Sequence, residues 1–267
     1  LYGQNLDIVS DPDKLQIMPK TTKDSGSVVV DLPLFMTSEG INNDIYAIGS
    51  TGKFYKRTSG AWSLLRTLGG GNAQGMNYFN NLIYFASGDR LGTYNPSGGA
   101  FNESYQTLNT SDWHPCVSFM DKIMIGNGQT LAYVDGSSIW ESAILTIDND
   151  YRIKSLEVIG GGNWLAIGTE KLDKADAKLF LWDGFSVNYN EVITIKENGI
   201  NAIVNSDSIV LIQAGARGNL YQCTGTSLAL VKVIPLVGSG LTAKAYPGAV
   251  CNHLGDPLIG VSEGSST

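Results

Sequence analysis

The sequence is poor in the residue types on which most catalytic and metal sites depend. It has 2 histidines and 3 cysteines in 267 residues, and 16% of its residues are charged. The cysteines, Cys116, Cys223 and Cys251, lack metal-ligand spacing, so we interpret them as buried apolar side chains; a Cys116–Cys251 disulfide stays open. His114 and His253 have no carboxylate or cysteine at ligand spacing. We therefore expect no catalytic residue, no metal site, no cofactor and no enzymatic activity.

Positive charge and long apolar runs are also scarce. The formal net charge is −7, which argues against partners such as nucleic acids or anionic membranes, because both attract basic surfaces. No apolar run is long enough for a membrane-spanning helix, so we expect no membrane insertion. The chain begins with Leu1, which leaves its natural start and its compartment open.

Glycine is abundant, with 32 residues, but the glycine-rich segments do not match the motifs of phosphate-binding loops. The two GGGN segments at 69–72 and 160–163 lack a following helix and a GK[ST] sequence, so we interpret them as turns rather than phosphate loops. The acidic stretches at 11–13, 148–150 and 173–176 lack the spacing of a calcium loop and are interpreted as solvated turns. No G-x-S-x-G motif is present either.

The most informative feature is a repeat. Five times a strand-like run ends near an aromatic residue, a short turn containing glycine follows, and a second strand-like run begins. The marker residues are Tyr55, Tyr94, Tyr133, Trp182 and Tyr221, separated by 39, 39, 49 and 39 residues. A period of about 40 residues is typical of propellers and solenoids.

Each repeat resolves into four short strands. The clearest is a continuous apolar run, found six times as IYAIGS, IYFAS, IMIGN, LAIGT, IVLIQAG and LIGVS. Polar turns precede these runs, as expected for antiparallel hairpins. The fold class is therefore predicted to be all-β, a β-propeller of four-stranded antiparallel blades, six in number, with almost no helix. A two-sheet sandwich is the alternative, but it does not explain the regular copies.

The ends of the chain differ from the repeats. We predict an extended N-terminal arm over residues 1–30 and a propeller over 31–267. The sixth copy is interrupted after two strands, so either an N-terminal strand completes the last blade or the chain is a fragment of a longer protein. Arm residues expected to anchor the chain in an assembly are Tyr2, Leu6, Ile8, Leu15 and Ile17. A disordered tail is the alternative reading of this segment.

Aromatic residues recur near the turn between the third and fourth strands. Rings flanked by Asn, Asp and Ser can bind a pyranose, so the candidate carbohydrate-binding residues are Tyr55, Trp62, Tyr94, Tyr133, Trp140 and Trp182. The competing and favoured interpretation is that the same rings pack between blades and hold the ring together.

Two resemblances bear on function. The segment DIYAIGSTGKFYKRTSGAWSLL resembles tectonin-type repeats, which implies a carbohydrate-binding propeller. The opening GQNLDIVSDPDKLQIMPKTTKDSGSVVVDLP, followed by that segment and by GMNYFNNLIYFASGDRLGTYNP, is similar to long hypothetical proteins of environmental tailed phages. That similarity implies a virion component with an arm and a propeller, and tail proteins of short-tailed phages also contain propellers.

The resulting expectation is a non-enzymatic structural or attachment component of a phage virion, in the tail or on the particle surface. Its expected partners are other virion proteins, further copies of itself in a symmetric assembly, and a host surface glycan. The alternative is a tectonin-like lectin, secreted or at the cell surface. A propeller enzyme, such as a glycosidase or a quinone-dependent dehydrogenase, is the least favoured class because no paired carboxylates recur.

Overall fold

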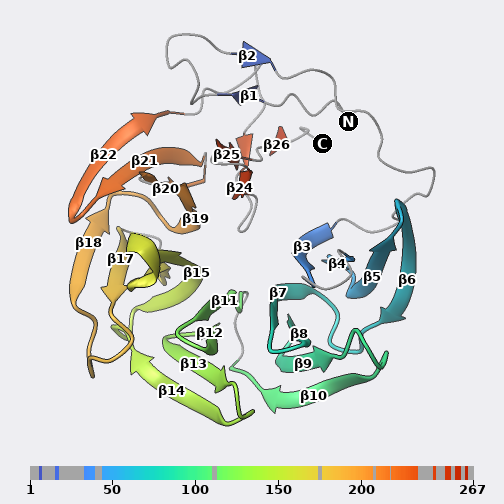
Figure 1. Ribbon diagram of the computed structural model, residues 1–267. Helices are drawn as coiled ribbons and strands as arrows, with labels where there is room; N and C mark the ends of the chain where they lie inside the picture. The colour runs from blue at the N-terminus through green and yellow to red at the C-terminus, as the bar shows by residue number, and fades with distance from the viewer. Residues whose placement is uncertain are drawn as a thin grey trace. The chain divides into compact units, whose positions relative to one another are not determined.

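The structure is a computed structural model dominated by short antiparallel strands (Figure 1). It describes residues 6–7, 16–17, 33–39, 44–109, 113–173, 176–206, 209–216, 218–233, 243–244, 250–253, 256–259 and 262–263. Over these ranges the only helical segment is a 3-10 turn, η1 (Gly160–Gly162). No helix within the described ranges has the length and apolar character needed to cross a membrane. The chain divides into two compact units, Lys23–Ile153 (the first unit) and Leu1–Thr22 with Lys154–Thr267 (the second unit).

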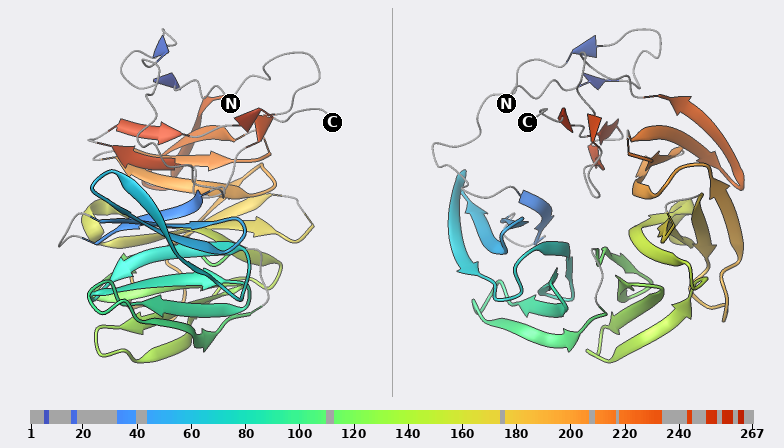
Figure 2. Two further views of the ribbon diagram at one scale, coloured as in Figure 1. Left: turned by 90° about the vertical axis from the view of Figure 1, so that its right-hand side faces the viewer. Right: turned by 180° about the vertical axis from the view of Figure 1, so that it is seen from behind.

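The first unit contains three four-stranded sheets, and in each sheet neighbouring strands follow one another along the chain (Figures 1 and 2). Sheet one is β3 (Pro33–Ser38), β4 (Ile45–Gly49), β5 (Lys53–Thr58) and β6 (Ala61–Thr67). Sheet two is β7 (Ala73–Phe79), β8 (Leu82–Ser87), β9 (Arg90–Tyr94) and β10 (Phe101–Thr107). Sheet three is β11 (Cys116–Phe119), β12 (Lys122–Asn127), β13 (Thr130–Asp135) and β14 (Trp140–Thr146).

The second unit holds two more such sheets. Sheet four is β15 (Tyr151–Ile159), which begins at the unit boundary, with β16 (Trp164–Lys171), β17 (Ala177–Trp182) and β18 (Glu191–Ile195). Sheet five is β19 (Ile200–Ser206), β20 (Ile209–Ala214), β21 (Asn219–Thr224) and β22 (Ser227–Lys232). Three two-stranded pairs complete it: β1 (Leu6–Asp7) with β2 (Gln16–Ile17), β23 (Ala243–Lys244) with β26 (Ser262–Glu263), and β24 (Val250–His253) with β25 (Asp256–Ile259).

Turn chemistry explains why these strands fold back on their neighbours. Asn80 and Asn81 adopt φ angles of 47° and 62° between β7 and β8, which asparagine tolerates better than most residues. A recurring backbone bond ties the end of the fourth strand to the turn between strands two and three. Its donors and acceptors are Leu68 N–H to Gly52 O, Leu108 N–H to Asp89 O, and Ile147 N–H to Gln129 O, at 2.8 to 3.0 Å. In these three sheets the bond extends the pairing of the third and fourth strands to the end of the fourth strand.

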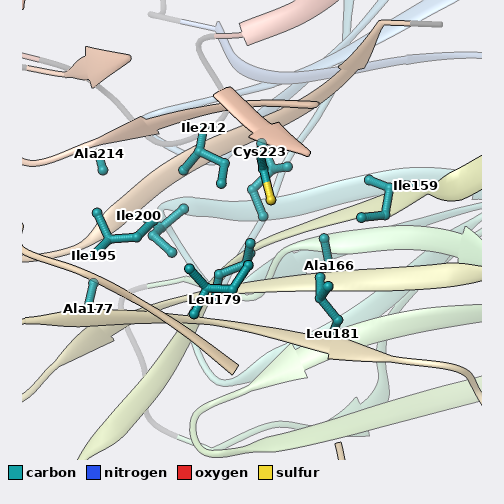
Figure 3. Packing of buried hydrophobic residues seen from close by; sticks show 12 residues of the cluster. Ile159, Ala166, Ala177, Leu179, Leu181, Ile195, Ile200, Ile212, Ala214 and Cys223 are labelled. Carbon is teal, nitrogen blue, oxygen red and sulfur yellow. The ribbon is translucent and has the colours of Figure 1, made fainter. Parts of the chain in front are cut away.

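Apolar side chains fill the spaces between successive sheets. In the first unit, one core cluster joins sheets one and two and another joins sheets two and three. In the second unit, Ala166, Leu179 and Leu181 of sheet four pack with Ile212 and Cys223 of sheet five (Figure 3). Strands with apolar residues on both faces are thus buried between neighbours, as the continuous apolar runs predict.

The outer edge strands differ in regularity. The pairing of β6, β10, β14 and β22 with its neighbour contains a register shift in each case. Such β-bulges bend an edge strand and hinder its pairing with other chains. The pairing of β18 with β17 is continuous from Leu181 and Glu191 to Ala177 and Ile195. Among the five outer strands named here, β18 alone keeps a regular edge.

The predicted fold class is confirmed: the five complete copies are four-stranded antiparallel sheets, the unit from which β-propellers are built. The sixth copy is described as the hairpin β24–β25, which matches the two strands that the sequence supplies. Both GGGN segments form turns, the second as η1. The predicted boundary between arm and propeller falls in the stretch 18–32, outside the described residues.

Candidate functional site

The structure places the six candidate carbohydrate-binding residues in two environments. Tyr55, Tyr94 and Trp182 are buried. Tyr94, for example, lies 4.4 Å from the Phe101 ring and 5.4 Å from the Phe54 ring, measured between centroids. These buried rings pack as expected for residues that hold neighbouring strands and sheets together.

The other three candidates, Trp62, Tyr133 and Trp140, are partly exposed. Trp140 packs against the core between sheets two and three, and the Lys122 ammonium lies 5.2 Å from the centroid of the Tyr133 ring. Trp62 lies on the outer strand β6, opposite Arg57. These three rings keep part of their surface open to solvent, and they remain the candidates for contact with a ligand.

The predicted arm anchors lie mostly outside the described residues. For Leu6 and Ile17 the backbone is described, and the two residues are paired in the short β1–β2 ladder. Tyr2, Ile8 and Leu15 fall in stretches that the structure does not describe. The role proposed for the arm therefore stays a prediction.

The turns between the third and fourth strands share a local device. In three sheets the first turn residue is Asn95, Asp135 or Asp183, and its side chain accepts hydrogen bonds from backbone N–H groups that follow. Asn95 Oδ1 accepts from Ser97 at 3.0 Å, and Asp135 Oδ1 accepts from Ile139 at 2.8 Å. Such bonds fix a loop without a surrounding core.

The loop from Asp183 to Asn190 is the most extensively bonded of the three. Asp183 Oδ1 accepts from the N–H groups of Phe185 and Ser186 at 2.9 and 2.8 Å, and its Oδ2 accepts from the Ser186 hydroxyl at 2.8 Å and from Asn190 Nδ2 at 3.0 Å. The Trp182 indole donates to Ser186 O at 2.7 Å. The Ser186 and Phe185 N–H groups lower the pKa of Asp183, because they stabilise its charged form. The carboxylate therefore stays ionised and holds the loop in one shape.

This fixed loop carries two apolar side chains at its tip. Phe185 is 82% exposed and Val187 is 88% exposed. Residues 183–195 include the acidic Asp183 and Glu191 but no lysine, arginine or histidine. An aromatic side chain that is exposed and already ordered loses little entropy on binding, and such residues dominate binding energy in protein interfaces. We define residues 183–190 as the apolar loop.

A second polar feature, in the first unit, is structural. Asp44 accepts hydrogen bonds from Lys56 at 2.6 Å and from Thr58 at 2.9 Å, and the Lys56 ammonium lies 5.6 Å from the centroid of the Tyr46 ring. Lys56 lowers the pKa of Asp44, and the Asp44 carboxylate raises the pKa of Lys56. Burial raises the pKa of Tyr46 to about 12. The paired charges join β5 to the start of β4.

His114 and Cys116, which the sequence left as structural candidates, are fully buried and partly buried, respectively. His114 is fully buried, its Nδ1 lies 2.8 Å from Gly126 O, and burial lowers its pKa. Burial raises the pKa of Cys116 to about 12, which makes it unreactive. Cys116 and Cys223 are free thiols. The side chains of Cys251 and His253 lie outside the described residues.

Among the carboxyl groups of the described residues, only that of Glu157 on β15 has a pKa that approaches neutrality. Burial raises its pKa to about 7, although the N–H of Asn205 on β19 partly offsets this effect. Within the described ranges, no group of three or more His, Cys, Asp or Glu residues is arranged to hold a metal ion. A single half-buried acid does not define a reaction.

The sequence interpretation did not place Phe185 among its candidate residues and missed the apolar loop as a unit. The signal was present as DGF directly after a strand, because an Asp-Gly pair begins a turn and Phe and Val then stand among polar residues. The regular edge of β18 carried no comparable signal, because a bulge depends on pairing with the neighbouring strand.

Comparison with known proteins supports the fold and goes no further. No family model matches the chain, and no curated protein sequence matches it. The solved structure of U3-55K aligns at 13% identity with a TM-score of 0.57, over 79% of this chain and 72% of that chain. The WD40 repeats of RRP9 align at 13% identity with a TM-score of 0.56, with the same two coverages. The extracellular domain of the putative one-component system BT4673 from B. thetaiotaomicron aligns at 16% identity with a TM-score of 0.53, over 71% of this chain and 26% of that chain. The chain therefore has a β-propeller fold.

Proposed function

We propose that this protein is a non-enzymatic structural or attachment component of a phage virion, in the tail or on the surface of the extracellular particle. The observation that carries the proposal is the apolar loop, in which Asp183 fixes an exposed Phe185 and Val187. A fixed apolar tip on a four-stranded sheet suits a permanent contact with another protein. The resemblance to hypothetical phage proteins supplies the setting. The proposed role needs no cofactor and no nucleic acid.

The partners of the proposal are other virion proteins and further copies of this chain in a symmetric assembly. A lipid bilayer is a poorer partner for the apolar loop, because only two apolar side chains protrude and the adjacent charges, Asp183 and Glu191, are acidic. A protein pocket that is apolar and has a basic rim matches the loop in both respects.

The test is to purify the native particle, identify its proteins by mass spectrometry, and then produce particles with Phe185→Ser and Val187→Ser together. The proposal expects the chain in many copies per particle and at least tenfold less of it after the double change. Leu172→Ser is the matched control, because Leu172 is 57% exposed in the turn at the opposite end of β17. Particles that lack the wild-type chain would exclude the proposal.

Glycan binding is the second candidate function. Trp62, Tyr133 and Trp140 are partly exposed, so a glycan could contact these rings more readily than the buried ones. In that case the protein is a lectin, either on the particle, where it binds a host surface glycan, or secreted or at the cell surface. A glycan array with the wild-type chain and with Trp62→Ala and Trp140→Ala tests this candidate. Binding that survives both changes would rule these rings out.

A further inference from the structure

The apolar loop, residues 183–190, combines exposed apolar side chains with negative charge. Phe185 and Val187 are 82% and 88% exposed, so neither side chain is covered within its own chain. Asp183 stays ionised because the hydrogen bonds that it accepts stabilise its carboxylate, and residues 183–195 contain no basic residue. A surface that receives this loop must therefore be apolar and positively charged.

One face of sheet one has both properties. Trp62 and Leu64 lie two residues apart on β6, so their side chains point to the same side of the sheet. Leu64 is 52% exposed and Trp62 is partly exposed. On β5, Arg57 lies opposite Trp62 and Tyr55 lies opposite Leu64, and the strand alternation places Lys53 on this side as well. We define Lys53, Arg57, Trp62 and Leu64 as the sheet-one patch.

The charged residues in the strands of sheet one are all positive. β3, β4, β5 and β6 contain no acidic residue and four basic ones: Lys53, Lys56, Arg57 and Arg66. Lys56 and Arg66 point to the opposite face, where they pair with Asp44 and Glu103. The other two basic residues belong to the sheet-one patch, which therefore matches the apolar loop in both polarity and charge.

Two other exposed apolar side chains are less suitable as receivers of an acidic loop. Ile139 is 59% exposed, but it lies in a turn that begins with Asp135, and this charge would repel the loop. Leu230 on β22 is 52% exposed, like Leu64, but β22 carries a single basic residue, Lys232, and no aromatic residue. Charge and ring content therefore select the sheet-one patch.

We propose that the apolar loop of one copy of this chain docks on the sheet-one patch of a second copy. This inference deepens the proposed function, and it rests on that function for the claim that several copies work together. Phe185 packs against Trp62 and Leu64, where its ring gains an aromatic partner. The negative charge of the loop faces Lys53 and Arg57.

The contact joins two different surfaces, so each paired copy keeps one loop or one patch for a further copy. Contacts of this head-to-tail kind build rings when the rotation between copies closes, and filaments when it does not. Few side chains take part, so we expect weak self-association of the isolated chain, with a Kd on the order of 100 µM. In a particle that holds many copies, the effective concentration exceeds this value and the contact is saturated.

The experiment is sedimentation velocity of the isolated full chain over a concentration series to about 1 mM, well above that Kd. The loop variant carries Phe185→Ser and Val187→Ser, and the patch variant carries Trp62→Ser and Leu64→Ser. Each variant should self-associate about tenfold more weakly than the wild type, because each lacks one of the two surfaces. Mixed together, the two variants should form a dimer and nothing larger, because the intact patch of the first binds the intact loop of the second.

The matched control is Leu230→Ser, which removes an equally exposed leucine from β22 and should leave self-association unchanged. Lys53→Glu tests the charge of the patch and should weaken self-association by about fivefold. Thermal unfolding confirms that each variant is folded, and Leu64→Ser alone serves as a milder patch variant.

Four outcomes would overturn the inference: a monomer throughout the series, self-association that survives the patch changes, loss of self-association in Leu230→Ser, or variants that stay monomeric when mixed. The last outcome would mean that the loop contacts a second loop. Failure of self-association leaves membership of the particle intact, whereas absence of the chain from particles sinks the proposed function and leaves self-association measurable.

Discussion

Sheets four and five differ at one position of their second strands, where sheet four has a glycine and sheet five has a buried glutamine. Gly168 on β16 faces sheet five, and a Cβ added there would lie 2.2 Å from Ser155 Oγ and 2.6 Å from Ile200 Cγ2. On β20 the corresponding residue is Gln213, since IGT in one repeat aligns with IQA in the other. Gln213 is 1% exposed, and among the described residues neither of its amide atoms has a hydrogen-bond partner.

The difference between Gly168 and Gln213 affects the face of sheet five that points away from sheet four. Ile212 and Ala214 point into the core shared with sheet four, so Gln213 points to the opposite face of sheet five. The Gln213 side chain occupies the position that Gly168 leaves open in sheet four. The junction between sheets four and five is thus tightly packed, whereas the other face of sheet five carries a buried amide.

The largest effect on stability should come from adding a methyl group at the tight junction between sheets four and five. Gly168→Ala would force the new methyl group into Ser155 and Ile200, and we expect it to lower the free energy of unfolding by about 3 kcal/mol. Urea denaturation gives the value. Gly136→Ala is the control, because nothing lies within 4 Å of its added Cβ, and it should change stability by no more than about 0.5 kcal/mol. Equal effects at the two positions would contradict the close approach.

The junction between sheets two and three contains a buried histidine, His114, whose effect on stability can be tested by changing the pH. The N–H of His114 donates to Gln74 O at 2.9 Å, and the imidazole is fully buried with its pKa lowered from 6.5. Below pH 6.5 the unfolded chain binds a proton at His114 that the folded chain does not, so His114 lowers stability as the pH falls. Glu157, whose pKa burial raises to about 7, has the opposite effect over the same range. We expect the His114 contribution to have a slope of up to about 1.4 kcal/mol per pH unit.

The measurement for His114 is urea denaturation between pH 7.5 and 5, with His114→Gln as the comparison. Glutamine does not titrate, so the variant should lose stability at pH 7.5, and the stability difference between the wild type and the variant should shrink as the pH falls. Identical slopes for the two proteins would show that His114 does not contribute to the pH dependence.

The smallest effect should come from Gln213 itself. An amide buried without partners costs free energy, so Gln213→Leu should raise the free energy of unfolding by about 1 kcal/mol. Leucine keeps most of the volume and removes the polar atoms. Differential scanning calorimetry would detect the change as a higher Tm. A lower Tm would mean that the amide is bonded in the folded protein and that the two faces of sheet five are more alike than we infer.

Much of the fold could be predicted from the sequence because its signals are local. Apolar runs of five residues, each preceded by a polar turn, locate β4, β8, β12, β16 and β20. The spacing of Tyr55, Tyr94 and Tyr133 shows that the unit repeats. Both signals report hairpins whose strands are neighbours along the chain, so no long-range contact has to be known.

The candidate site was less predictable because it depends on what surrounds each side chain. Tyr94 and Phe185 both belong to the recurring aromatics, yet one is buried and the other is 82% exposed. The exposure of Phe185 follows from bonds between Asp183 and backbone groups. The bulges that set β18 apart likewise depend on pairing with the neighbouring strand, which composition and periodicity do not report.

The measurement that tests the central claim most directly is the mass of the assembly that contains this chain, taken from its native source without dissociation. The account predicts a large particle that contains many copies of the 28.6 kDa chain in a symmetric arrangement. A free monomer of the calculated mass, with no copies in any particle, would contradict the claim that this propeller is a virion component.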